Sequence, residues 1–172
     1  AGYLDAWTDR PVSRGELAKA LLEELDGLED YIYLQQMRFD GRITVEKQIL
    51  VDPARARLPS FTLQPVIENA FSHGLKACEE GGRVLLRVWR QGRMLYVTVA
   101  DNGKGMTEEE LAALSEKMRQ SEQTGKSIGL GNIFRRGSML YSDTGKMQVF
   151  SRAGHGTVIR FEIPQGEEEE RA

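Results

Sequence analysis

The sequence contains little cysteine, no long apolar run and no cluster of basic residues. Its single cysteine, Cys78, cannot form a disulfide within the chain, which fits a reducing, cytosolic setting. No apolar run approaches the roughly 18 to 20 residues that span a bilayer, so we expect no direct membrane contact by this chain. The formal net charge of -3 and the absence of a Lys or Arg run argue against a nucleic acid partner bound through its phosphates.

Signs of a natural N-terminus or of secretion are missing as well. The chain begins at Ala1 without an initiator methionine, and its first ten residues lack the charged and apolar regions of a signal peptide. We therefore expect a piece of a longer protein, whose anchoring in a membrane the sequence leaves open. Its 172 residues, 40% of them hydrophobic and 28% charged, suffice for one soluble domain with a single core.

The first half of the chain mixes helical and strand-like patterns. Apolar residues recur at spacings of three and four over 14–39 and predict a helix, which a capping box of Ser13 and Glu16 would begin. Alternation over 43–51 predicts a strand. A second amphipathic helix is predicted over 62–76.

The second half predicts two hairpins with helices between them. Gln91 and Gly92 supply the turn of the first hairpin, and Thr107 with Glu110 forms a capping box at the start of a short helix. The polar stretch 119–127 is expected to be a mobile connection. The predicted elements are strands at 83–90 and 94–100, helices at 108–118 and 129–141, strands at 146–152 and 157–163, and a solvated acidic tail at 167–170.

Three motifs follow one another in an order that suggests a nucleotide pocket. The first is the helical segment Gln-Pro-Val-Ile-Glu-Asn-Ala-Phe-Ser-His-Gly at 64–74. Two glycine turns come after it, Asp-Asn-Gly-Lys-Gly-Met at 101–106 and Gly-Leu-Gly-Asn at 129–132. Each turn alone is common, so the prediction depends on the combination.

The combination resembles the ATP-binding domain shared by gyrase, a heat-shock chaperone, histidine kinases and MutL. Leu-Gln-Pro-Val-Ile-Glu-Asn-Ala at 63–70, with the upstream segment 31–39, is similar to the LytS-like class of sensor histidine kinases. The resemblance implies an α+β fold of the Bergerat type, a two-layer α/β sandwich with a mixed, mostly antiparallel sheet and helices on one face. We divide the chain into an upstream linker and connecting helix (1–39), the ATP-binding domain (40–164) and an acidic tail (165–172).

The resemblance assigns Asn69 to Mg²⁺, a hard ion that takes oxygen ligands and usually keeps several waters while it bridges phosphates. An asparagine on a helix surface would look the same in isolation. Asn69, His73 and Lys76 are predicted to share a helix face, on which His73 either contacts phosphate or caps the helix. Glu68 either orients a water near the metal or is a solvated carboxylate.

Asp101 ends a predicted strand, where its carboxylate can accept a hydrogen bond from the exocyclic amine of adenine. The resemblance implies that Asp101 recognises adenine, that Thr157 shares this role, and that Met106 lies at the nucleotide. Gly103 and Gly105 would let the backbone approach the base. The alternatives are a plain Asn-Gly turn and an ordinary strand threonine.

A second part of the pocket is predicted around Gly129, Leu130 and Gly131, since free N–H groups at the start of a helix favour phosphate oxygens. The stretch 119–127 would be the lid over the nucleotide. Lys126 either contacts a phosphate or faces solvent.

Two departures from the family pattern bear on the reaction. Gyrase-like and chaperone-like members place a water-activating glutamate where this chain has Pro65, which disfavours hydrolysis as the main reaction. The LytS-like class carries its phosphoacceptor in an Asn-Pro-His-Phe sequence, and this chain has only His73 and His155. The family also usually has a basic residue at the position of Ser72.

These predictions leave three alternative hypotheses about the function of the chain. The first is a histidine kinase catalytic domain that binds Mg²⁺ and ATP and passes a phosphoryl group to a histidine outside the chain. Its partners would be an upstream dimerisation and phosphoacceptor domain and a response regulator. The second is a nucleotide-sensing module without transfer activity, and the third is a gyrase-like ATPase.

Overall fold

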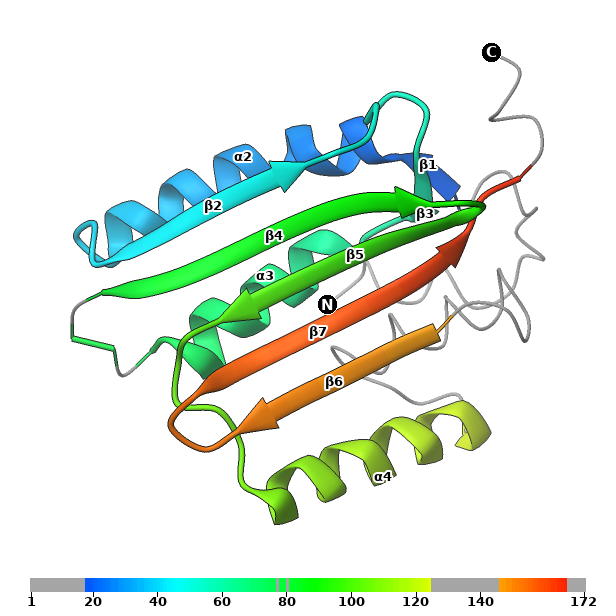
Figure 1. Ribbon diagram of the computed structural model, residues 1–172. Helices are drawn as coiled ribbons and strands as arrows, with labels where there is room; N and C mark the ends of the chain where they lie inside the picture. Colours follow the sequence, from blue (N-terminus) through cyan, green and yellow to red (C-terminus); the bar gives the residue numbers. More distant parts are fainter. Residues whose placement is uncertain (1–17, 77, 80, 125–145, 167–172) are drawn as a thin grey trace, which may run out of the picture.

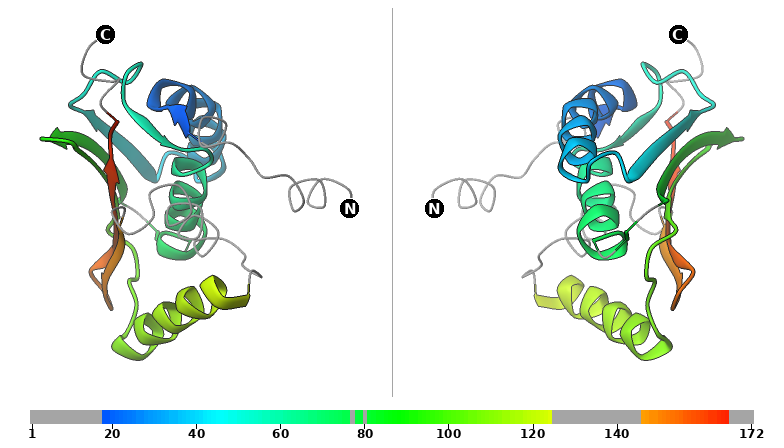
Figure 2. Two further views of the ribbon diagram at one scale, coloured as in Figure 1. Left: turned by 90° about the vertical axis from the view of Figure 1, so that its right-hand side faces the viewer. Right: turned by 90° about the vertical axis from the view of Figure 1, so that its left-hand side faces the viewer.

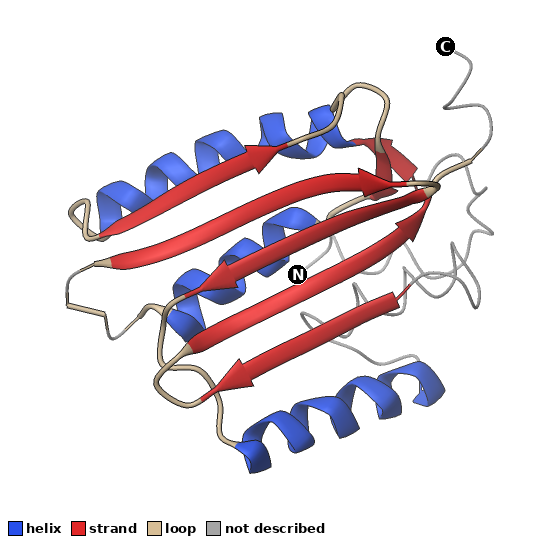
Figure 3. Ribbon diagram, in the orientation of Figure 1, coloured by secondary structure: helices blue, strands red, loops and turns tan. Residues whose placement is uncertain are grey.

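A five-stranded mixed sheet forms the centre of the computed structural model, which describes residues 18–76, 78–79, 81–124 and 146–166. The strand order is β2-β4-β5-β7-β6 (Figures 1 and 3). Only β2 pairs in parallel, with β4, and the other neighbours are antiparallel. The strands are β2 Ile43–Ile49, β4 Gly82–Gln91, β5 Met94–Asp101, β6 Lys146–Arg152 and β7 Gly156–Pro164.

Helices α2 (Leu21–Arg38) and α3 (Leu63–Asn69) cover one face of this sheet, as Figure 2 shows. A π-helical turn, η2 (Ala70–Gly74), continues α3. Helix α4 (Glu108–Thr124) lies beyond the β6 edge (Figure 1). The arrangement confirms the predicted α+β sandwich with a mixed sheet and helices on one face.

The core lies between the sheet and the two helices. Alternate residues of β4 and β5 point into it, as their period of two predicts: Val84, Leu86, Val88, Leu95, Val97 and Val99 are all buried. Phe71 of η2 is 1% exposed and packs against Tyr31 and Phe39, with ring centroids 6.3 Å and 5.9 Å away. Burying one such ring stabilises the fold by about 1.5–3 kcal/mol. The motif helix is therefore held against α2.

The start of the first helix was predicted wrongly. Residues Ala18–Ala20 form strand β1, which pairs antiparallel with β3 (Arg57–Pro59), a strand that the sequence did not predict. Helix α2 then begins at Leu21, whose N–H donates to the Ala56 carbonyl. Ala and Lys are good helix formers, so tertiary pairing overrides local propensity here. The capping box predicted at Ser13 lies outside the described residues.

Two other boundaries differ from the predictions. Helix α4 continues to Thr124, so much of the stretch predicted as a mobile connection is helical. Its predicted start is confirmed, because the Thr107 N–H donates to the Glu110 carboxylate at 2.9 Å and the Glu110 N–H to the Thr107 hydroxyl at 3.2 Å. The predicted helix at 129–141 lies outside the described residues. The domain division at residue 39 stays a prediction, and α2 contributes Leu28 to the common core.

Candidate nucleotide-binding site

A cleft of about 400 Å³ opens where η2, the first glycine turn, the start of α4 and strand β7 meet. Asn69 and His73 line it from the motif helix, and Gly105, Met106 and Thr157 line it from the turn and the sheet. Five residues chosen from the sequence therefore surround one space, although almost ninety residues separate the first from the last.

Asp101 adjoins this cleft through Gly74, which lines it and lies against the Asp101 carboxylate. It ends β5 opposite Thr157 of β7, and its Oδ1 accepts the Gly103 N–H at 2.9 Å. Burial raises the pKa of the Asp101 carboxyl, and hydrogen bonds from the backbone of Gly103 and Thr157 partly oppose this shift. The carboxylate is thus a half-buried acceptor held by the strand end.

The glycines of the turn allow close packing of protein backbone, which is a different reason from the predicted approach to the base. A Cβ on Gly103 would lie 2.0 Å from the Gly74 carbonyl oxygen. A Cβ on Gly105, whose φ is 63°, would lie 2.0 Å from the Arg152 carbonyl oxygen. The Lys104 N–H donates to the same Gly74 carbonyl at 3.0 Å. The turn is therefore clamped between η2 and the β6–β7 hairpin.

Ser151 is a site residue that the sequence reasoning missed. Its Oγ accepts the Met106 N–H at 2.9 Å, donates to the Gly156 carbonyl at 3.0 Å and lies 2.9 Å from the Thr157 hydroxyl. It sits on β6 directly opposite Thr157 in the strand register. The available signal was a serine just before a glycine-containing turn, which becomes informative only once the hairpin register is known.

Glu68 and Lys76 do not share the cleft with Asn69. Both line a separate pocket of about 150 Å³ beside α2, together with Tyr31. Neighbouring helix residues point about 100° apart, and the π-turn inserts an extra residue before Lys76. The prediction that Asn69, His73 and Lys76 share one helix face is therefore wrong for Lys76. The catalytic role of Glu68 stays a prediction, which the placement of its side chain does not favour.

Two lysines that the sequence reasoning did not select line the cleft. Lys104 belongs to the glycine turn and Lys117 to α4. Both lysines line the cleft beside His73, which suits an anionic ligand, and the acidic Glu110 lines it as well. The predicted phosphate residues Lys126, Gly129, Leu130 and Gly131 lie outside the described residues.

The amide oxygen of Asn69 suits a magnesium ion that is bound mainly by phosphate oxygens. Asn69 is half-buried on the cleft wall and offers a hard amide oxygen. Within the described ranges, no group of three or more His, Cys, Asp and Glu residues could hold a metal ion. Any magnesium bound at Asn69 would therefore take most of its ligands from phosphate oxygens and water.

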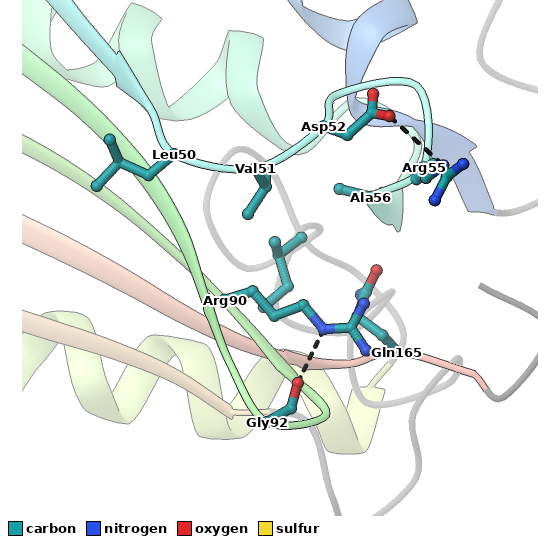
Figure 4. A pocket seen from close by; sticks show the side chains of 9 residues that line it. Leu50, Val51, Asp52, Arg55, Ala56, Arg90, Gly92 and Gln165 are labelled. Atoms are coloured by element: carbon teal, nitrogen blue, oxygen red, sulfur yellow. Dashed lines mark hydrogen bonds and ion pairs between the residues drawn. The ribbon is translucent and has the colours of Figure 1, made fainter. Parts of the chain in front are cut away.

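A second cavity, of about 480 Å³, opens at the opposite ends of the strands (Figure 4). There the Arg90 Nε–H donates to the Gly92 carbonyl at 2.8 Å, and Arg55 pairs with Asp52 at 3.5 Å. None of the residues that the sequence predicted for the nucleotide lines this cavity. The cleft at Asn69 is therefore the candidate site, although it is the smaller of the two.

The helices that the structure describes are too short or too polar to cross a bilayer. The chain is 29% identical over 144 residues to the sensor protein kinase HptS of Staphylococcus aureus, matching 84% of this chain and 27% of that protein. It thus spans about a quarter of this relative's length.

Solved structures of histidine kinases share the fold. The catalytic domain of histidine kinase ThkA superimposes with a TM-score of 0.60 at 20% identity, over 86% of this chain and 96% of that one. ThkA in complex with response regulator protein TrrA gives a TM-score of 0.55 at 18% identity, over 90% of this chain and 42% of that one.

A family model matches most of the chain and includes every described residue of the cleft. The model is that of the histidine kinase-, DNA gyrase B-, and HSP90-like ATPases, and it matches residues 60–167. The chain belongs to this ATPase family.

Proposed function

We propose that the chain is the ATP-binding catalytic domain of a sensor histidine kinase of the LytS-like class. It holds Mg·ATP while a histidine of a separate dimerisation and phosphoacceptor domain attacks the γ-phosphorus. The bond to ADP breaks, and the phosphoryl group later passes to a response regulator. The segment 63–70 supports the LytS-like class, and the named relative HptS supports a sensor kinase.

One observation carries the proposal: Asn69 and His73 line the same cleft as Thr157, and Asp101 adjoins it through Gly74. The Asp101 carboxylate and the Thr157 hydroxyl can both accept hydrogen bonds, which suits adenine, because it presents an amine where guanine presents a carbonyl. The Asn69 amide oxygen and His73 suit Mg²⁺ and phosphate. The cleft therefore combines groups that suit the base with groups that suit the charged end of ATP.

The chain would contribute positioning and electrostatic stabilisation, since phosphoryl transfer asks little covalent chemistry of the protein. Asn69 would supply an oxygen to Mg²⁺, which neutralises charge on the phosphates when bound. Lys104 and Lys117 would face the same anionic groups, as would Lys126 and the glycines of 129–131. Pro65 leaves the chain without the glutamate that activates water in the gyrase-like members.

The test is a labelling experiment with [γ-³²P]ATP. The chain is incubated with Mg·ATP alone and with the phosphoacceptor domain of the parent kinase. We expect acid-labile phosphohistidine on the acceptor domain only. The proposal fails if stable phosphohistidine forms on this chain.

Two other outcomes would point to the alternative functions. Tight ATP binding without any labelling of the acceptor would identify a nucleotide-sensing module. Steady phosphate release that Asn69→Ala abolishes would identify a gyrase-like ATPase.

A further inference from the structure

The hydroxyl of Ser151 connects three parts of the cleft wall. It contacts the Met106 N–H at the start of α4, the Gly156 carbonyl in the hairpin turn and the Thr157 hydroxyl on β7. A serine hydroxyl has one proton and two lone pairs. These three neighbours use all of that capacity, so the direction of each hydrogen bond can be worked out.

Two of the three directions are fixed by the partner groups. The Met106 N–H can only donate, and it lies 2.9 Å from Ser151 Oγ. The Gly156 carbonyl can only accept, and it lies 3.0 Å away. The Ser151 proton therefore goes to Gly156, because any other direction would leave two acceptor oxygens facing each other at that distance.

The third direction follows from the other two. Ser151 has one lone pair left for Thr157, whose Oγ1 lies 2.9 Å away, so the Thr157 hydroxyl donates its proton to Ser151. Thr157 is 7% exposed and lines the cleft. With its proton turned inward, it offers only lone pairs to a ligand there.

We infer that Ser151 is a positioning residue that fixes the Thr157 hydroxyl as a hydrogen-bond acceptor, so that Thr157 and Asp101 together select a base with an amine at this position. The inference rests on the proposed function, since it assumes that the cleft holds the base of ATP. Two acceptors match the two N–H groups of the adenine amine. A base with a carbonyl at that position would meet lone pairs from both residues.

The experiment compares binding of Mg·ATP with that of Mg·ITP, whose base carries a carbonyl in place of the adenine amine. Affinities of the whole chain are measured by calorimetry for the wild type, Ser151→Ala, Thr157→Val and the double variant. Ser115→Ala is the control, because Ser115 is exposed and its hydroxyl donates to the Leu111 carbonyl of its own helix. Thermal unfolding is followed for each variant.

We expect the wild type to prefer ATP and Ser151→Ala to narrow this preference by about tenfold, because Thr157 can then turn its proton toward the carbonyl of ITP. In the Thr157→Val background, Ser151→Ala should change the preference by less than about twofold. If the role of Ser151 were merely structural, Ser151→Ala would lower the affinities for both nucleotides equally. Ser151→Cys keeps the shape and weakens the hydrogen bonds, so it tests the same point if Ser151→Ala does not fold.

Two results overturn the inference, and they are distinguishable. If the wild type prefers ATP and the Ser151 variants retain the full preference, Ser151 does not set the direction of the Thr157 hydroxyl. If the wild type binds neither nucleotide, the proposed function fails and the inference fails with it.

Discussion

Gly74 and Asp101 are so close that a Cβ on Gly74 would lie 2.6 Å from Oδ1 of the Asp101 carboxylate. The same Oδ1 accepts the Gly103 N–H at 2.9 Å. Any side chain at Gly74 must therefore turn the carboxylate away from this hydrogen bond. The end of the motif helix thus determines the position of Asp101, the residue predicted to recognise adenine.

Gly74→Ala should lower the affinity for ATP by at least about tenfold, since it displaces a charged hydrogen-bond acceptor. Calorimetric titration measures this loss. Gly27→Ala is the matched control, because a Cβ at Gly27 in α2 meets nothing within 4 Å. The control should bind ATP as the wild type does and be more stable by about 0.5–1 kcal/mol. Equal affinities of the two variants would show that the position of Asp101 is unimportant for binding.

Asp101→Asn should narrow the preference for ATP over GTP by at least about tenfold without unfolding the chain. The asparagine oxygen can still accept the Gly103 N–H, but its amide adds donors where adenine also presents donors. Removing a half-buried charge should leave the free energy of unfolding at pH 7 unchanged or higher. Denaturant titrations and nucleotide competition measure the two effects. A strongly destabilised variant would mean that the carboxylate is mainly structural.

Binding of ATP should weaken on acidification at a higher pH than for an ordinary aspartate. Burial raises the pKa of the Asp101 carboxyl. Only the ionised carboxylate accepts a hydrogen bond from the adenine amine without presenting a proton of its own to that amine. The effect on stability has the opposite sign: the buried charge opposes folding above the raised pKa, and this penalty is lost as the pH falls below the unfolded value. Affinity measured from pH 8 to pH 4 should show the shift, and Asp101→Asn should remove it.

Gly156→Ala and Gly154→Ala, in one hairpin turn, should differ strongly in stability. Both glycines have positive φ, 83° and 78°. A Cβ at Gly156 would lie 1.8 Å from the Asp101 carbonyl oxygen, whereas one at Gly154 meets nothing within 4 Å. We expect Gly154→Ala to cost about 1–2 kcal/mol and Gly156→Ala at least about 3 kcal/mol. Chemical denaturation measures both, and similar losses would contradict the contact between the β6–β7 turn and β5.

Asn69→Ala should remove most of the magnesium dependence of ATP binding. The wild type should bind ATP at least about tenfold more tightly with Mg²⁺ than with a chelator present, and the variant should show a ratio near one. Gln64→Ala is the control, as an exposed residue of the same helix. An unchanged ratio in Asn69→Ala would place the metal elsewhere.

Regular elements with a strong period were predictable from the sequence, and pairings between distant segments were not. The alternation of β4 and β5 and the capping box of α4 carry their signal locally. Strand β1 does not, because Ala18–Ala20 becomes a strand only through pairing with Arg57–Pro59. The π-turn after Asn69 is equally invisible to a period of 3.6, which is why Lys76 was assigned to the wrong face.

The same distinction holds for the site. Asn69, Asp101 and Thr157 lie in motifs that the sequence displays, so their grouping could be predicted. Ser151 matters because β6 places it opposite Thr157, and Gly74 because η2 ends against Asp101. Both relationships depend on tertiary contacts that spacing along the chain does not encode.

The most direct test of the central claim is a calorimetric titration of the chain with Mg·ATP and Mg·GTP, before and after Asp101→Asn. We predict saturable binding of one ATP per chain, GTP binding at least about tenfold weaker, and a clearly smaller difference in the variant. Absence of ATP binding, or a preference for ATP that Asp101→Asn leaves unchanged, would contradict the assignment of the cleft between Asn69 and Thr157 to ATP.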